Sequence, residues 1–160
     1  MKMNLPGILS TARFSQVGFV CNDIEETKKR FALLFGIEPV PTQDCGEYFV
    51  TKTEVFGKPA PDADSVLAFM NLTPGVQLEL IQPNAAPSVW RDWITEHGEG
   101  IHHIAFGVDD ADLTAQQLID EFGAVIEQRG IYGDGSGQYI YLDCFEQLKC
   151  RIELLQSFRK

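Results

Sequence analysis

Residues 103–110 of this chain are HIAFGVDD, and residues 16–23 are QVGFVCND. Both stretches open on a polar residue, continue as an apolar strand and end on residues that can begin a helix. In each copy a Phe-Gly pair follows, with Gly36 lying 20 residues after Gln16 and Gly123 lying 20 residues after His103. Each copy then closes on a strand with a central glutamate, LELIQ at 78–82 and IELLQ at 152–156. We therefore predict that one structural module occurs twice.

Each module is predicted to contain a strand, a helix and three further strands. The expected helices span 24–35 and 111–122; Asn22-Asp23 and Asp109-Asp110 precede them, and Gly36 and Gly123 end them. The expected strands are 14–20, 47–53, 66–72 and 76–81 in the first module, and 101–108, 124–128, 139–142 and 150–155 in the second. This pattern predicts an α+β fold in which paired βαβββ modules form a cupped, antiparallel-rich mixed sheet.

Apolar positions on the two helices are expected to cover one face of that sheet. They are residues 24, 31, 34 and 35 on the first helix and 115, 118, 119 and 122 on the second. The other connections are expected to be a Pro/Gly/Asp-rich loop over 56–65 and a glycine loop over 130–137.

We expect residues 1–160 to form one domain. Module one covers about 13–83, a linker helix about 87–97 and module two about 100–157. With 160 residues, 44% of them hydrophobic, the chain can bury about two-thirds of its unfolded surface. Trp90 and Trp93 lie three residues apart and are expected to anchor the linker helix in the core.

Composition excludes several classes of function. The net charge of −10, without a Lys/Arg cluster, is unfavourable for binding the phosphate backbone of nucleic acids. Residues 1–11 lack the features of a signal peptide, and no stretch approaches the ~20 apolar residues that span a membrane. We therefore expect a cytoplasmic protein, whose four cysteines are reduced and show no CxxC spacing.

Strand alternation predicts that four polar side chains share one face of the sheet, opposite the face under the helices. They are Gln16, Glu79, His103 and Glu153. The residue two positions after each first-strand polar residue is small, Gly18 or Ala105, which leaves room beside such a site. His102, next to His103, is expected to face the other way and to be structural.

Three oxygen ligands and one imidazole nitrogen suit a divalent cation of intermediate hardness such as Co, Ni, Zn, Mn or Fe. Four protein ligands in a six-coordinate site leave two adjacent positions for water. A substrate with two neighbouring oxygens can replace both waters, and the cation then stabilises an enolate or enediolate when the adjacent carbon loses its proton.

From about Phe14 to Gln156 the chain resembles the vicinal oxygen chelate superfamily, which includes glyoxalase I, methylmalonyl-CoA epimerase, extradiol dioxygenases and bleomycin-resistance proteins. The resemblance is specific at GIHHIAF (100–106), QLELI (77–81) and RIELL (151–155). The stretch from Ser88 through GEGIHHIAF, and GDGSG (133–137) before YIYL, are most similar to methylmalonyl-CoA epimerase. The resemblance implies metal binding by the four polar residues and a homodimer.

The ligand set departs from that epimerase, whose first ligand is usually His and whose second is usually Gln. Gln-Glu-His-Glu is instead the set of animal-type glyoxalase I. The three positions that bind glutathione in that enzyme are Val20, Pro83 and Glu99 here, where it has arginine, asparagine and arginine. The resemblance therefore implies an epimerase or isomerase without fixing which one.

Glu153 is predicted to be the general base, because a carboxylate beside the metal can take a proton from the chelated substrate. An epimerase needs a second acid/base on the opposite face, which the resemblance places on the strand after the first helix. Glu47 is the candidate there, and Glu79 is the alternative.

The favoured function is thus a metal-dependent epimerase or isomerase, similar to methylmalonyl-CoA epimerase, acting on a small molecule such as an acyl thioester. A lactoylglutathione-lyase-type isomerase is the close alternative. A small-ligand binding or resistance protein without catalysis is the third hypothesis. Neither nucleic acid nor a membrane is expected as a partner.

Overall fold

The computed structural model describes residues 7–158. The helices of this part are α1 (Ile24–Phe35), α2 (Tyr48–Thr51), α3 (Val89–His97), α4 (Ala111–Phe122) and α5 (Phe145–Leu148). Its strands are β1 (Arg13–Val20), β2 (Gln43–Asp44), β3 (Glu54–Val55), β4 (Lys58–Pro59), β5 (Ser65–Thr73), β6 (Val76–Pro83), β7 (Gly100–Gly107), β8 (Val125–Ile131), β9 (Gly137–Asp143) and β10 (Arg151–Ser157). Among these residues, no helix is long and apolar enough to cross a membrane.

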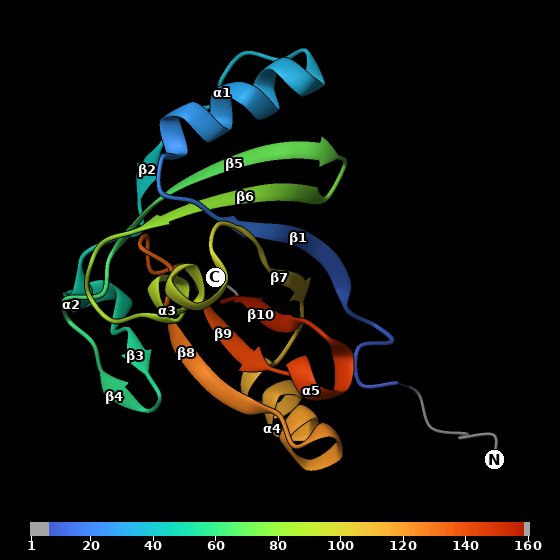
Figure 1. The fold of residues 1–160 in the computed structure, drawn as a ribbon. Coiled ribbons are helices and arrows are strands. Elements are labelled where there is room, and N and C mark those ends of the chain that lie inside the picture. Colours follow the sequence, from blue (N-terminus) through green and yellow to red (C-terminus); the bar gives the residue numbers. More distant parts are fainter. Residues whose placement is uncertain (1–6, 159–160) are drawn as a thin grey trace.

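The strands form one curled mixed sheet in the order β2-β5-β6-β1-β7-β10-β9-β8-β3-β4. Antiparallel pairing of β1 with β7 joins the two modules, and each of these strands also pairs in parallel with the last strand of its own module, β6 or β10. Helix α1 lies against β5 and β6, and α4 against β9 and β10 (Figure 1). The predicted α+β architecture with a cupped mixed sheet is confirmed.

The first module differs from prediction between its helix and its long hairpin. Residues 47–53, predicted as a strand, contain the short helix α2, and the strand after α1 is only the two residues of β2. Gly46 adopts a positive φ of 111° and its Cα lies against the backbone of Gly133, so the chain turns out of the sheet there. The β-branched residues that favoured a strand are overridden by this tertiary contact.

The predicted loop over 56–65 also departs from prediction, because β4 lies within it and pairs with β3, which directly precedes it, as a hairpin. Strand β3 pairs with β8, so residues of module one extend the sheet edge of module two. Strand β8 continues to Ile131 and β9 begins at Gly137, which shortens the predicted glycine loop.

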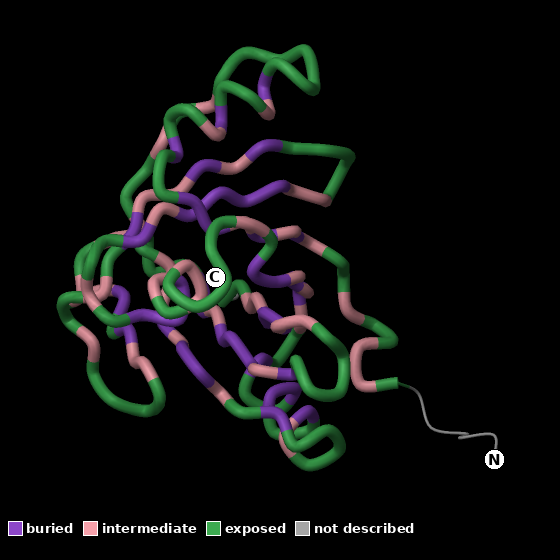
Figure 2. The backbone as a smooth tube through the Cα atoms, viewed as in Figure 1, coloured by how far each residue is buried: buried purple, intermediate pink, exposed green. Residues whose placement is uncertain are grey.

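The core consists of apolar clusters beneath the helices (Figure 2). Under α4, Ala115 and Leu118 pack with Leu142 and Leu154, which confirms part of the predicted helix face. The predicted face of α1 is partly wrong. Its buried residues are Ile24, Lys28 and Ala32, whereas Leu34 is 72% exposed.

The buried face of α1 is rotated toward Lys28, whose side chain is buried although its polar partners lie toward the surface. Its ammonium group donates to Glu25 and to the hydroxyl of Thr42, which follows the helix in the chain. A buried ammonium is tolerated when it is paired, so the helix can turn Lys28 inward and leave Leu34 outside.

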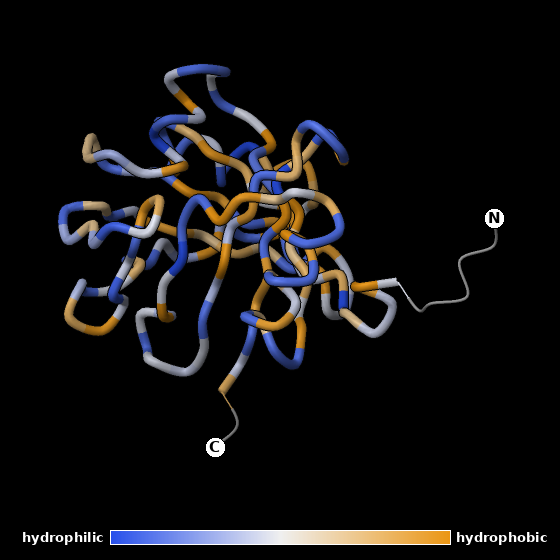
Figure 3. The backbone as a smooth tube through the Cα atoms, turned by 90° about the horizontal axis from the view of Figure 1, so that it is seen from below, coloured by the Kyte–Doolittle hydropathy of each residue, from blue (hydrophilic) through white to orange (hydrophobic). Residues whose placement is uncertain are grey.

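The hydropathy of the chain follows the same division between core and surface. Figure 3 shows apolar segments gathered toward the middle of the molecule and hydrophilic segments in the outer loops.

We predict that Asp110→Ala destabilises the protein by about 1 kcal/mol and that Asp109→Ala has a smaller effect. The Asp110 carboxylate caps α4 by accepting a hydrogen bond of 2.9 Å from the backbone N–H of Leu113. Chemical denaturation of both variants measures the difference. Equal destabilisation would contradict the assignment of Asp110 as the helix cap.

Candidate metal centre

Four adjacent strands at the middle of the sheet, in the order β6-β1-β7-β10, carry the four predicted ligands. Glu79 lies on β6, Gln16 on β1, His103 on β7 and Glu153 on β10. Gly18 stands opposite both Glu79 and His103, and Ala105 stands opposite Gln16 and Glu153. Residues that stand opposite each other on neighbouring strands project from the same face of a sheet. The duplicated strands therefore bring the four side chains to one face at the junction of the modules.

Three of these side chains converge closely. The Nε2 atom of His103 lies 3.2 Å from an oxygen of Glu79 and 3.1 Å from an oxygen of Glu153. All three residues are buried. Two ligands at right angles about a cation, each about 2.1 Å from it, lie about 3.0 Å apart. The observed spacings therefore fit three adjacent ligands of one divalent cation.

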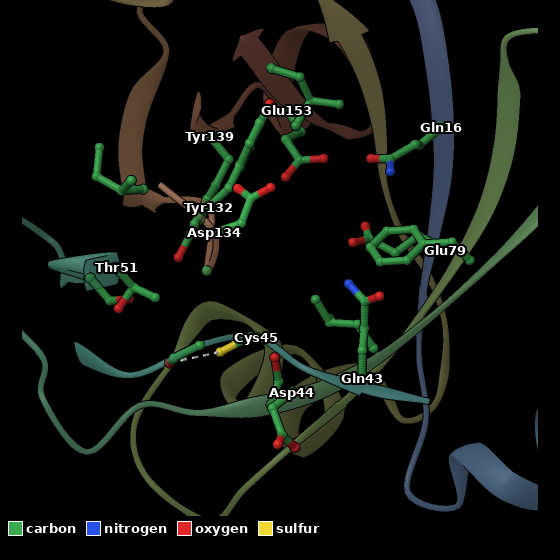
Figure 4. Close-up of a pocket in the computed structure, with 18 of the residues that line it drawn as sticks. Gln16, Gln43, Asp44, Cys45, Thr51, Glu79, Tyr132, Asp134, Tyr139 and Glu153 are labelled. Carbon is green, nitrogen blue, oxygen red and sulfur yellow. Dashed lines mark hydrogen bonds between the residues drawn. The ribbon is translucent and has the colours of Figure 1, made fainter. Parts of the chain in front are cut away.

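Each of the four residues also has one buried polar atom that makes no hydrogen bond of normal geometry, although three of these atoms face one another in the contacts of 3.1 and 3.2 Å. These atoms are Gln16 Oε1, Glu79 Oε2, His103 Nε2 and Glu153 Oε2. Gln16 donates its amide N–H to the side-chain oxygen of Gln77 at 3.3 Å, and its own oxygen is left for another partner. Figure 4 shows Gln16, Glu79 and Glu153 pointing toward one another. Because native proteins rarely leave buried polar atoms unpaired, this donor set fits a bound cation.

Burial and mutual charge shift the pKa values of this cluster. Burial raises the pKa of Glu79, and the negative charge of Glu153 adds to that rise although His103 opposes it. For His103, burial alone would lower the pKa, but the charges and hydrogen bonding of Glu153 and Glu79 outweigh it and raise the pKa to about 9. Without a metal, the proton on His103 is thus held between two carboxylates. A divalent cation would take the place of that proton.

His102 does not face away from His103 as predicted. Between the pairs Gly18–His103 and Phe19–Ile101, β7 has one more residue than β1, which is a β-bulge at His102. The bulge breaks the alternation, and the Nδ1 atoms of the two histidines lie 3.0 Å apart. Burial, then the charges of His103 and Arg151, hold the pKa of His102 well below its ordinary value.

The neutral His102 ring therefore accepts the Nδ1 proton of His103. This hydrogen bond orients His103 so that its Nε2 faces the two carboxylates. Ligating histidines are commonly oriented through their other ring nitrogen in this way. This role could not be predicted from sequence, because the bulge that creates it has no local sequence signature.

A cavity of about 720 Å³ opens from the cluster toward the glycine loop. The Gln43 side chain, on β2, points into this cavity (Figure 4). Glu47 is exposed at the N-terminal end of α2 and does not line the cavity. The strand after the first helix contributes both Gln43 and Asp44 to the cavity wall, but the Asp44 carboxylate points away from Glu79 and Glu153 (Figure 4), so the side chain of this strand that faces the cluster is an amide. The glycine loop is held close to module one, since a Cβ on Gly133 would lie 2.4 Å from the carbonyl oxygen of Cys45.

The family model described as the Glyoxalase/Bleomycin resistance protein/Dioxygenase superfamily matches residues 15–141. No curated protein matches the chain.

Among solved structures, a methylmalonyl-CoA epimerase variant of Streptomyces coelicolor in complex with 2-nitronate-propionyl-CoA is similar, with 23% identity and a TM-score of 0.63. That match covers 92% of this chain and 98% of the other. The methylmalonyl-CoA epimerase of Mycobacterium tuberculosis is 15% identical with a TM-score of 0.64, and the match covers 99% of this chain and 95% of that one. At these identities the likeness shows the fold.

We predict that Gly18→Ala weakens the binding of Co²⁺ or Zn²⁺ at least about tenfold. A Cβ on Gly18 would lie only 1.9 Å from the imidazole of His103, so the ring would have to leave its position. Titration calorimetry on metal-free protein measures the affinity.

Gly107→Ala on β7 is the matched control, because a Cβ there would meet the end of the flexible Arg13 side chain at 3.1 Å and the Ser15 hydroxyl at 3.2 Å. Unfolding transitions of both variants show whether each is folded. Metal affinity unchanged in a folded Gly18→Ala protein would contradict the assignment of His103 as a ligand.

Proposed function

The chain belongs to the Glyoxalase/Bleomycin resistance protein/Dioxygenase superfamily, and from that premise we propose that it is a divalent-metal-dependent epimerase or isomerase. The reaction proposed is removal of a proton from a carbon next to a carbonyl. The observation that carries the proposal is the convergence of four buried polar atoms, one from each predicted ligand, beside a cavity whose wall includes Gln16, Glu79 and Glu153.

Gln16, Glu79, His103 and Glu153 are the residues proposed to hold the metal. When bound, a divalent cation would act as a Lewis acid that lowers the energy of the negative charge developing on a chelated carbonyl oxygen. The metal is proposed as a divalent cation of intermediate hardness, because the donor set combines carboxylate and amide oxygens with an imidazole nitrogen.

Two carboxylates flank His103, at 3.2 Å and 3.1 Å from its Nε2 atom. Glu153 is proposed to take the proton from the substrate carbon. Glu79 is proposed to return a proton on the other face, since Glu47, the other candidate, lies outside the cavity. The cavity walls are proposed to limit the access of water to the reacting carbon.

The neighbours favour an epimerase among the alternatives. A solved methylmalonyl-CoA epimerase with the same fold is in complex with methylmalonyl-CoA and NH4+. An acyl thioester is accordingly proposed as the substrate class. The Gln-Glu-His-Glu ligand set favours the second candidate, an isomerase of the lactoylglutathione lyase type. The superfamily also contains binding proteins, but the four side chains and their unpaired atoms favour a metal centre. The homodimer and the cytoplasmic location stay predictions.

We predict that Glu153→Gln slows proton abstraction by about 10²–10⁴-fold, because an amide keeps the size of the side chain but removes the base. Loss of the α-proton in D2O, followed by NMR, measures this step directly. The probes are 2-methylacyl-CoA thioesters and the hemithioacetals of phenylglyoxal, with protein loaded with Co²⁺ or Zn²⁺.

Glu47→Gln serves as the comparison in the same assay. The exposed Glu47 carboxylate lies outside the cavity, so that variant is expected to exchange protons like the parent. Full exchange in Glu153→Gln would refute the proposed base, and loss of exchange in Glu47→Gln would restore Glu47 as a candidate. No exchange by the parent with either class of probe would refute the proposed reaction on these substrates.

A further inference from the structure

The cavity continues beyond the metal centre, and two more buried polar atoms in its wall lack a hydrogen-bond partner. They are the indole nitrogen Nε1 of Trp90 and the hydroxyl oxygen of Ser65. Trp90 is 5% exposed and Ser65 is 4% exposed. Within residues 7–158, the unpartnered buried side-chain atoms are these two, the four ligand atoms and Nε2 of His102. Six of the seven thus belong to the metal centre or to the cavity wall.

A single aromatic ring, that of Tyr141, lies between Trp90 and the His103 ring of the metal centre. The ring centroids of His103 and Tyr141 are 4.9 Å apart, and those of Tyr141 and Trp90 are 6.0 Å apart. The indole N–H is near enough to the Tyr141 hydroxyl to oppose the rise in that hydroxyl's pKa caused by burial, but it makes no hydrogen bond of normal geometry. A buried indole N–H usually has a partner. The N–H of Trp90 is therefore a donor without a hydrogen bond of normal geometry, in a residue that lines the cavity.

Ser65 begins β5, and its backbone is already held on both sides. Its N–H donates to the Asp64 carboxylate at 2.7 Å, and its carbonyl accepts from the N–H of Cys45 at 3.1 Å. These bonds fix the position of the residue. Its hydroxyl makes no hydrogen bond of normal geometry, although it is near enough to the Cys45 thiol to oppose the rise in that thiol's pKa caused by burial. A hydroxyl can donate or accept, so Ser65 and Trp90 together offer neutral hydrogen bonds.

The described cavity wall contains carboxylates but no lysine or arginine. Arg129 is paired with Asp112, and Arg151 is paired with Glu127 and stacks on Trp93. Apart from the charged ligands and the acidic residues near the opening, the wall is aromatic or neutral, with Phe69, Trp90, Tyr132, Tyr139 and Tyr141. A negatively charged group placed among these rings would lose its hydration without gaining a cationic partner.

We infer that the part of the substrate lying beyond the metal is uncharged and presents a hydrogen-bond acceptor, such as a carbonyl, to Trp90 and Ser65. The inference rests on the proposed function and narrows it, because it disfavours an acyl group that carries a free carboxylate in the cavity. A thioester with an uncharged acyl group, or an uncharged hydroxyketone, meets the requirement.

The test uses hydroxamic acids as probes, because a hydroxamate offers two neighbouring oxygens to a metal. Benzohydroxamic acids with a 4-acetyl, a 4-isopropyl or a 4-carboxylate group differ in the distal part alone. Calorimetry on protein loaded with Co²⁺ or Zn²⁺ gives the affinities. The 4-acetyl probe is expected to bind at least about tenfold more tightly than the 4-carboxylate probe, because the carboxylate would lose its hydration in the cavity.

Trp90→Phe is expected to remove most of the preference for the 4-acetyl over the 4-isopropyl probe, a loss of about tenfold for one hydrogen bond, while metal content stays unchanged. Trp93→Phe is the matched control, because Trp93 lies on the same helix and does not line the cavity. In 15N-labelled protein, the indole N–H signal that disappears in Trp90→Phe is expected to shift downfield with the 4-acetyl probe only.

Equal or tighter binding of the 4-carboxylate probe, or an unmoved Trp90 signal, would overturn this inference and leave the metal centre intact. Failure of all three probes to bind metal-loaded protein would overturn the chelation on which the proposed function depends, and the inference with it. The two failures are therefore distinguishable.

Discussion

The structure depends on the burial of two carboxylates and an imidazole at the middle of a continuous sheet. Removing an ionised group from water costs several kcal/mol unless a partner replaces the water. The Oε2 atoms of Glu79 and Glu153 lie 3.2 and 3.1 Å from Nε2 of His103, yet neither makes a hydrogen bond of normal geometry with it. A divalent cation at their centre would give every one of these atoms a partner. The need of these buried charged groups for a partner is therefore the physical reason to expect a bound cation.

The duplication of the module brings the charged and polar groups together, because it places equivalent strands side by side. The first and last long strands of each module lie side by side, and β1 and β7 join the modules, so the polar residues of four strands reach one face. The small residues Gly18 and Ala105 stand opposite the ligands. Gly18 leaves the space that the ring of His103 occupies. With a larger residue at position 18, the ligands would keep their positions along the strands, but the imidazole of His103 would have no room.

Much of this arrangement was predictable from the sequence, because a repeat preserves register. Equivalent positions in two copies of one strand pattern must occupy equivalent places, so the shared face and the role of Gly18 could be inferred before any coordinates. Features that depend on contacts between distant segments were not predictable. The bulge that turns His102 toward His103 arises from pairing with β1, and the turn that displaces Glu47 depends on Gly46 meeting Gly133. The buried face of α1 likewise follows from the partners of Lys28.

The most direct test of the central claim is the metal content of the protein. Elemental analysis of protein purified without chelator is predicted to find about one divalent ion per chain in the parent and little in the His103→Ala variant. An absence of metal from the parent, even after reconstitution with Co, Ni and Zn, would contradict the account. The four side chains would then be a remnant, and the cavity would belong to a protein that binds small molecules without chemistry.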